Sequence, residues 1–310
     1  MDLTLSKITA EKILALFIML CFGVLGHKMG LIDKEREKML SNLLINLITP
    51  VTFFVSFQQE FDSDKFMGLL ITFGIAALAH LIPIAIGHFA FKDDPKHQWQ
   101  IDRYCCTYGN CAFIRIPLIQ NNLGSEGVFY VMAFITIFNI LVFTHGVRLI
   151  SDGEAHTDLL HSVILNPIFI GIGLGLVCYL CRFMLPPIVL DPLRTLGNCN
   201  TPIAMLVAGS SLTGTNFKQI LKSGRTYSVS VIRLFIVPLL MIAICALLHI
   251  EQNVALSTII CAGAPVGTMA TVLAVQYDKD AAYSSGLFAF TTIICLITLP
   301  FVVAIYSLVM

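Results

Sequence analysis

The sequence predicts an all-α integral membrane protein with ten transmembrane helices, arranged as two inverted repeats of five helices each. Three observations predict this class: an apolar composition, ten long apolar runs, and motifs that recur in the two halves of the chain. Apolar residues make up 57% of the 310 residues and charged residues 12%, whereas soluble domains carry about 25% charged residues. A transmembrane β-barrel is excluded because its strands alternate polar and apolar residues.

The ten apolar runs are separated by short polar breaks, and a helix needs roughly 20 apolar residues to span a bilayer. In chain order they cover 11–31, 38–58, 67–91, 103–121, 127–150, 160–181, 187–212, 226–249, 253–275 and 281–308. The first run exceeds the length of a signal-peptide apolar region and lacks a small-residue cleavage site. We therefore predict that it is the first membrane helix.

Lysine and arginine gather on one side of the predicted membrane. Twelve lie in breaks after odd-numbered spans and five lie on the opposite side, while Arg115 and Arg233 lie within spans. Cytoplasmic loops carry the excess of positive charge, so both termini are expected outside the cytoplasm. The net charge is zero, and no nucleic-acid partner is expected.

Matched motifs predict an inverted repeat, with residues 1–155 and 156–310 as its halves. Thr49-Pro50 recurs as Thr201-Pro202, 152 residues later, and Pro117 recurs as Pro265, 148 residues later. Five spans per half is an odd number, so the second half enters the membrane from the opposite side. Inverted repeats are characteristic of secondary transporters, which bind substrate where corresponding helices are broken. Spans four and nine are therefore the predicted site.

Other classes of function lack the residues that they need. The polar breaks are too short for a soluble catalytic or nucleotide-binding domain, and no phosphate-binding glycine loop is present. Only Cys178 and Cys181 have a CxxC spacing, without a second pair for a zinc site. We expect no enzyme activity, no metal site and no cofactor. The acidic residues, Asp102 among them, fall in breaks or at span ends, so no mid-span carboxylate is available for a proton or sodium relay. A sodium site made from carbonyl and hydroxyl oxygens stays open.

Arg115 and Pro117 give span four its predicted chemistry. Proline lacks a backbone donor and clashes with the carbonyl four residues earlier, so the helix should break near Arg115. If the second half-helix begins near Pro117, its free amides carry partial positive charge, and the same holds beyond Pro265. A guanidinium beside two such ends would suit a carboxylate. The alternative for Arg115 is that it pairs with a carbonyl or reaches the membrane interface. For Arg233 we expect a structural role or an interfacial one.

Polar and small residues surround the two predicted breaks. The amides of Asn110 and Gln120 could bind a ligand or satisfy freed backbone groups. The small residues of span nine would let another backbone approach, or serve helix packing alone. Polar positions beside prolines in spans six and seven could line the route. The candidate substrate-binding residues are Asn110, Arg115, Pro117, Gln120, Asn166, Thr201, Gly263, Pro265, Val266 and Gly267.

The run GNCAFIRIPLI at 109–119, followed by Gly124-Ser125-Glu126-Gly127, resembles the fourth helix of the auxin efflux carrier family. The C-terminal run from Ala262 through APVGTMATVLAVQY, with Asp278 and Leu299-Pro300, resembles the same family. This family includes bacterial malate and malonate permeases and plant PIN-type carriers. The resemblance implies that helices four and nine cross at their prolines, with Asn110, Pro117 and Pro265 at the crossing. It also implies a scaffold of spans 1, 2, 6 and 7, and a mobile unit of spans 3–5 and 8–10.

The same resemblance implies an elevator-type carrier of small organic anions, commonly a homodimer. The short break at 151–159 resembles bacterial members, so the expected location is a bacterial inner membrane. Arg115 departs from the family, whose members usually have a small residue there, and it could select a dicarboxylate or mark an altered site. Two other hypotheses of function stay open. One is a sodium-coupled symporter of bile-acid carrier type, and the other is a membrane sensor that binds the anion without moving it.

Overall fold

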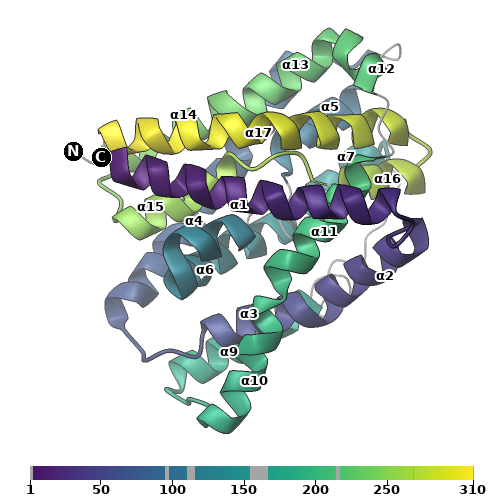
Figure 1. Ribbon diagram of the computed structural model, residues 1–310. Coiled ribbons are helices and arrows are strands. Elements are labelled where there is room, and N and C mark those ends of the chain that lie inside the picture. The colour runs from purple at the N-terminus through teal and green to yellow at the C-terminus, as the bar shows by residue number, and fades with distance from the viewer. Residues whose placement is uncertain are drawn as a thin grey trace.

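The computed structural model describes residues 3–94, 98–109, 116–153, 167–213, 217–267 and 269–309. Within these ranges the chain is helical apart from short connections and one isolated β-bridge. Figure 1 shows long helices running side by side, with α1 (Leu3–Lys28) next to α17 (Ala281–Val309). The helix α1 begins and α17 ends at the same end of the molecule (Figure 1), as an even number of membrane crossings requires.

The helices follow the predicted spans closely. In the first half they are α1, α2 (Lys34–Leu43), α3 (Thr49–Ser56), α4 (Ser63–Ala90), α5 (Trp99–Thr107), α6 (Ile116–Leu141) and α7 (Val147–Ile150). In the second half they are α9 (Pro167–Leu180), α10 (Pro187–Asn198), α11 (Asn200–Leu212), α12 (Phe217–Lys222), α13 (Gly224–Val231), α14 (Val237–Leu247), α15 (Gln252–Ala262), α16 (Met269–Gln276) and α17. Three π-helical segments, η1 (Leu44–Ile48), η3 (Val142–Gly146) and η4 (Ile232–Ile236), join flanking α-helices into continuous spans.

Five helical stretches of the described chain are long and apolar enough to cross a membrane: Lys34–Ser56, Ser63–Ala90, Glu126–Ile150, Gly224–Leu247 and Ala281–Val309. Phe17–Lys28, Pro167–Leu180 and Gln252–Ala262 are shorter apolar helices. The prediction of a helical, multi-pass membrane protein is confirmed. The full set of ten spans remains a prediction, because the five long stretches correspond to spans two, three, five, eight and ten, and the other five predicted spans are not among them.

Acidic residues at span ends start several of these helices. The carboxylate of Asp62 accepts hydrogen bonds from the backbone N–H groups of Asp64 and Lys65 at the start of α4. Glu251 does the same for the first turn of α15. A side-chain acceptor satisfies the free N–H groups of a helix start and complements its positive dipole. Gly124, with φ +65°, turns the chain within α6 and so separates the fourth span from the fifth.

Glycines set the closest helix contacts. A Cβ atom on Gly209 of α11 would collide with the carbonyl oxygen of Leu20 in α1, and one on Gly23 would collide with that of Leu206. A Cβ on Gly171 of α9 would lie 2.5 Å from the carbonyl oxygen of Pro50 in α3. Small residues allow such close backbone approach in membrane helices. The pairs α1–α11 and α3–α9 are therefore in tight backbone contact.

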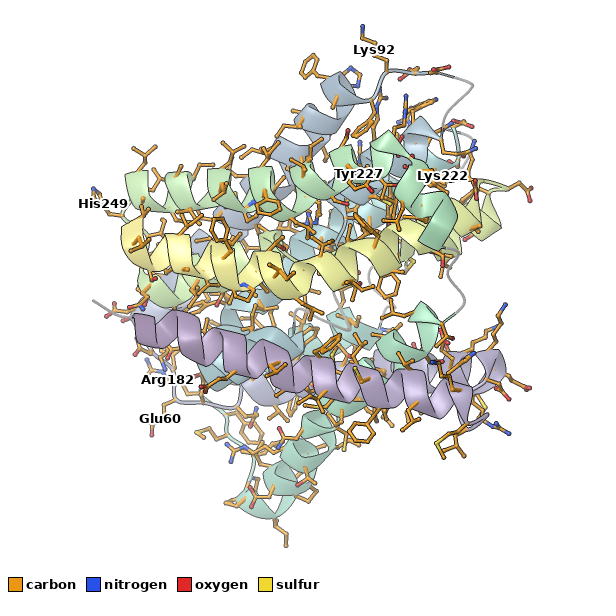
Figure 2. All side chains as sticks on the ribbon, turned by 45° about the horizontal axis from the view of Figure 1, so that its top comes forward. Glu60, Lys92, Arg182, Lys222, Tyr227 and His249 are labelled. Atoms are coloured by element: carbon orange, nitrogen blue, oxygen red, sulfur yellow. The ribbon has the colours of Figure 1, made fainter. Side chains whose placement is uncertain are left out.

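The two ends of the molecule differ in charge. Lys92 and Lys222 lie toward one end, and Glu60, Arg182 and His249 lie toward the other (Figure 2). At the lysine-bearing end, Asp152 accepts hydrogen bonds from Lys279 Nζ at 2.5 Å and Gln100 Nε2 at 2.7 Å. The Lys279 bond lowers the pKa of Asp152. These contacts join the start of α5 to the turns that follow α7 and α16.

Two glycines of α9 provide a matched test of the α3–α9 contact. We expect Gly171→Ala to lower the free energy of unfolding by about 1–3 kcal/mol, because the added methyl group meets the backbone of Pro50. Nothing lies within 4 Å of a Cβ on Gly173, so Gly173→Ala should be neutral or stabilising by up to about 1 kcal/mol. Thermal unfolding in detergent measures both. Equal stability of the two variants would contradict this packing.

Candidate functional site: the meeting of two broken helices

The first break lies between α5 and α6. The helix α5 ends at Thr107, and Tyr108 leaves helical geometry with φ −104° and ψ 103°. The next helix begins at Ile116, with Pro117 in its first turn, a position that proline favours because its missing N–H would have no partner there. Residues 110–115, which precede Ile116, lie outside the described ranges, so the start of a second half-helix near Pro117 remains a prediction.

The second break lies between α15 and α16. Gly263 caps α15, Ala264 to Gly267 are non-helical, and α16 begins at Met269. The candidate residues Gly263, Pro265, Val266 and Gly267 all lie in or beside this break, and all are buried. The interruption of span nine around Pro265 is therefore present in the structure.

The two breaks meet directly. Gly109 and Val266 form an isolated antiparallel β-bridge, and the N–H of Gly267 donates to the carbonyl of Tyr108 at 3.3 Å. Thr291 of α17 accepts the N–H of Val266 at 3.1 Å. These bonds satisfy backbone groups that the broken helices leave free, a requirement for non-helical backbone within a membrane. Candidate residues of span nine thus lie against the break of span four.

Arg233 binds both breaks at once. Its side chain comes from the π-helical segment η4 and is only 1% exposed. Its Nε donates to the carbonyl of Ala264 at 2.9 Å, and its Nη1 donates to the carbonyl of Thr107 at 3.0 Å. The structural alternative for Arg233 is correct, and the interfacial one is wrong, because the guanidinium lies in the protein interior.

This arrangement separates positive from negative helix ends. The carbonyl ends of α5 and α15 each carry roughly half a negative charge, and the guanidinium of Arg233 lies against both. The following helices, α6 and α16, begin with N–H ends that carry partial positive charge. An anion is the ligand that such N–H ends favour.

The family model described as membrane transport protein matches the chain over residues 8–162 and 154–303. The chain belongs to the auxin efflux carrier family. It is 24% identical to an uncharacterized transporter of Methanocaldococcus jannaschii, over 92% of this chain and 95% of the relative. It is also 24% identical to an uncharacterized transporter of Methanothermobacter thermautotrophicus, over 94% of this chain and 96% of the relative. The predicted family is confirmed, and both relatives are archaeal.

The structure describes only some of the other predicted site residues of this carrier. Asn110, Arg115 and Asn166 lie outside the described residues, and for Pro117 and Gln120 the structure describes the helix only. Thr201 lies in the first turn of α11. Its neighbour Asn200 is fully buried and donates to the hydroxyl of Thr49 at 2.9 Å. The repeated Thr-Pro motifs therefore meet where span two packs against span seven.

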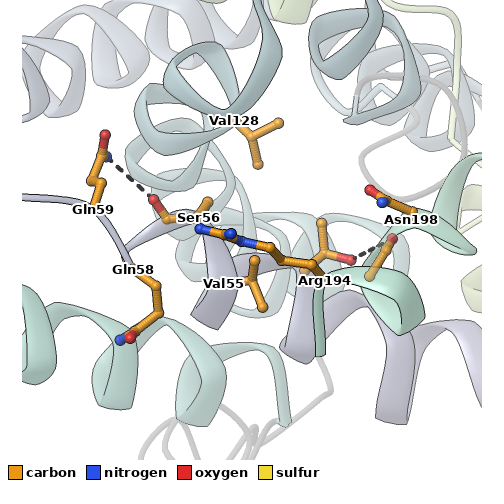
Figure 3. Close-up of a pocket in the computed structure, with 9 residues that line it drawn as sticks. Val55, Ser56, Gln58, Gln59, Val128, Arg194 and Asn198 are labelled. Atoms are coloured by element: carbon orange, nitrogen blue, oxygen red, sulfur yellow. Dashed lines mark hydrogen bonds between the residues drawn. The ribbon is translucent and has the colours of Figure 1, made fainter. Parts of the chain in front are cut away.

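A cavity of about 320 Å³ lies between α3, α6 and α10. Polar side chains line much of its wall, and Arg194 extends into it between Val55 and Val128 (Figure 3). The amide of Gln59 donates to the carbonyl of Ser56 at 3.2 Å on one side. The hydroxyl of Thr52 donates to the carbonyl of Gly197 on the other. This cavity could not be predicted from the sequence, because its lining residues come from three distant segments.

Two histidines flank the first break. The hydroxyl of Tyr108 lies 2.8 Å from Nδ1 of His145, which belongs to the π-helical segment η3. His80 of α4 is 1% exposed, and its ring lies 4.7 Å from that of Phe134 and 6.4 Å from that of Tyr108. His80 therefore packs against aromatic rings in the protein interior.

Asp102 is completely buried near the start of α5, although its sequence position suggested an ordinary span end. Its carboxylate pairs with Arg225 at 2.7 Å and accepts the hydroxyl hydrogen of Tyr283 at 2.7 Å. A charge held away from water needs such partners. The cluster joins α5 to α13 and α17 and so fixes the half-helix whose other end binds Arg233. Sequence spacing gave no sign of it, because the three residues are far apart in the chain.

The Asp102 cluster provides a stability test. We expect Asp102→Asn to lower the free energy of unfolding by about 2–4 kcal/mol, because Arg225 loses the partner of a buried ion pair. Asp93 is the matched control, since its side chain is 67% exposed while it pairs with Arg103. Asp93→Asn should change stability by less than about 1 kcal/mol. Chemical unfolding in detergent measures both, and a small effect at Asp102 would contradict its role as an anchor.

Proposed function

We propose that this carrier is a secondary transporter that moves small organic anions, mono- or dicarboxylates, across the cell membrane. The observation that carries the proposal is the bridge between Gly109 and Val266, where two helix breaks meet at a buried guanidinium. Broken helices at the interface of two repeats are where secondary transporters bind substrate. The negative helix ends are neutralised by Arg233, so the positive ends of α6 and α16 are available to a carboxylate.

An elevator movement is supported by the packing of the helices. The backbones of α1 and α11 are locked by Gly23 and Gly209, and those of α3 and α9 by Gly171. These helices form the proposed scaffold of spans 1, 2, 6 and 7. In the proposed mobile unit of spans 3–5 and 8–10, α6 packs on α4 and α15, and α16 packs on α17. The helices that carry both breaks thus belong to one proposed unit.

The cavity beside α3 is the proposed vestibule of this route. It lies between helices of the scaffold and α6 of the mobile unit, where an elevator must leave room for the substrate. Arg194, Asn198 and Gln58 supply hydrogen-bond donors suited to a carboxylate. Arg194 is half exposed and lies 3.7 Å from Asp191, so an entering anion can compete for its guanidinium.

The selectivity of the site is assigned to Arg115, with Asn110, Pro117 and Gln120 around it. Arg115 immediately precedes α6 in the chain, so it is near the proposed anion-binding helix start. A guanidinium binds carboxylates through two parallel hydrogen bonds. This supports a dicarboxylate, with one carboxylate at Arg115 and the other at the helix ends. Asn166 and Thr201 are the proposed lining of the route in spans six and seven.

The proposed assembly is a homodimer with ten spans per chain and both termini outside the cytoplasm. The distribution of charge supports this orientation, because the end that holds Lys92 and Lys222 is the one richer in lysine and arginine. The family includes bacterial permeases, which supports a bacterial inner membrane, while the archaeal relatives make an archaeal cell membrane the alternative.

Uptake of labelled mono- and dicarboxylates into proteoliposomes tests the function. We expect the wild-type protein to take up a dicarboxylate, and Arg115→Ala to lower its kcat/KM by about 10- to 100-fold, because a charge-assisted bidentate contact is lost. Arg115→Lys keeps the charge and should recover part of the activity. Binding without uptake would favour a sensor, and unchanged uptake by Arg115→Ala would remove this residue from the site.

A substitution of Arg194 tests the proposed vestibule. We expect Arg194→Ala to raise KM for the anion by about two- to fivefold, the effect of an exposed charge, and to leave kcat nearly unchanged. The matched control is Arg148→Ala, because Arg148 is an exposed cation at the opposite end of the molecule. Initial rates over a range of substrate concentrations separate KM from kcat. A loss of kcat at Arg194 would contradict a role in entry alone.

A further inference from the structure

Arg233 occupies a position whose chemistry suits a metal cation. Its partners are the carbonyl oxygens of Thr107 and Ala264, at 3.0 Å and 2.9 Å. One is the last residue of α5, and the other follows the cap of α15 by one residue. In transporters with broken helices, carbonyl ends of this kind coordinate the sodium ion that drives transport. Here a covalently attached guanidinium binds them.

Local structure brings the guanidinium to this position. Arg233 lies in the π-helical segment η4, which is followed by Pro238 in α14. A Cβ atom on Gly263 would lie 3.5 Å from the Pro238 ring and 3.0 Å from Leu299. Since Gly263 has no side chain, the break can lie close to the start of α14, and Arg233 reaches both carbonyls. Single π-helical turns are frequent at functional sites.

We propose that Arg233 is a resident cation that replaces an exchangeable coupling ion at the crossing, so that transport does not depend on a sodium gradient. Arginine stays protonated in proteins, and its attachment to η4 prevents release to either side of the membrane. It therefore supplies the charge that the helix ends need without transferring a second ion per cycle. The inference rests on the proposed transport function, and it separates this chain from a sodium-coupled symporter.

The first test is the ion dependence of uptake. Proteoliposomes with wild-type protein should take up the dicarboxylate at the same rate, within about twofold, in sodium, potassium or choline buffer. A rate in sodium that is about tenfold higher than in choline would overturn the proposal.

Chemical rescue is the second test and does not depend on knowing the substrate. We expect Arg233→Ala to lower the melting temperature in detergent, because buried carbonyl groups lose their donors. Guanidinium chloride at low millimolar concentration should raise that temperature, and urea at the same concentration should not. Neither solute should stabilise the wild type. If guanidinium and urea act alike on Arg233→Ala, the site is not a cation site and the proposal fails.

The two readouts distinguish the two proposals. If no carboxylate is transported by the wild type but guanidinium stabilises Arg233→Ala, the transport proposal fails and the cation site stands. Where Arg233→Ala is not recovered from membranes, Arg233→Lys replaces it. This variant keeps a charge without the planar fork, and it should melt below the wild type and gain from added guanidinium. In uptake, Arg233→Ala should lose at least about tenfold, with partial recovery in guanidinium.

Discussion

The hydrogen bonds of one buried guanidinium hold the centre of this fold together. Two helices stop in the interior of the protein, and each leaves carbonyl groups on buried residues, Thr107 and Ala264. Arg233 donates to one carbonyl of each end, and the Gly109–Val266 bridge pairs the neighbouring backbone. Isolated unsatisfied groups in hydrocarbon cost several kcal/mol each. The broken helices are therefore stable only as a pair, with Arg233 between them.

Carboxylates hold the N-terminal ends of the two half-helices α5 and α15. Asp102 pairs with Arg225 and Tyr283 near the start of α5, and Glu251 caps the start of α15. Each half-helix is thus anchored at one end by a carboxylate and at the other by Arg233. Both anchors have the sign that the helix dipole favours, negative at the N-terminus and positive at the C-terminus. The same electrostatic rule thus governs both ends of the two half-helices.

The sequence predicted the parts of this structure that depend on local patterns. Long apolar runs predicted α4 and α17. The repeat of Pro117 as Pro265 nominated span nine, where the chain is interrupted around Pro265, because proline has the same effect in any membrane helix. What could not be predicted depends on distance in space. The partners of Arg233 could not be predicted, because Ala264 and Thr107 accept its hydrogen bonds through backbone carbonyls, which a sequence does not mark. The burial of Asp102 depends on Arg225 and Tyr283, more than a hundred residues away.

Placing the cation on the protein has a consequence for the proposed elevator. Arg233, α5 and α15 all belong to the proposed mobile unit, so in an elevator movement the guanidinium and both carbonyl ends would move together and keep their hydrogen bonds. An exchangeable ion would have to bind on one side of the membrane and leave on the other. The charge of the site would then depend on whether the ion is bound. With Arg233 the local charge is the same in both positions. The guanidinium charge would move out and back in every cycle and cancel. The net charge transferred per cycle would then be that of the anion alone, and the membrane potential would act on loaded and empty units differently by that charge.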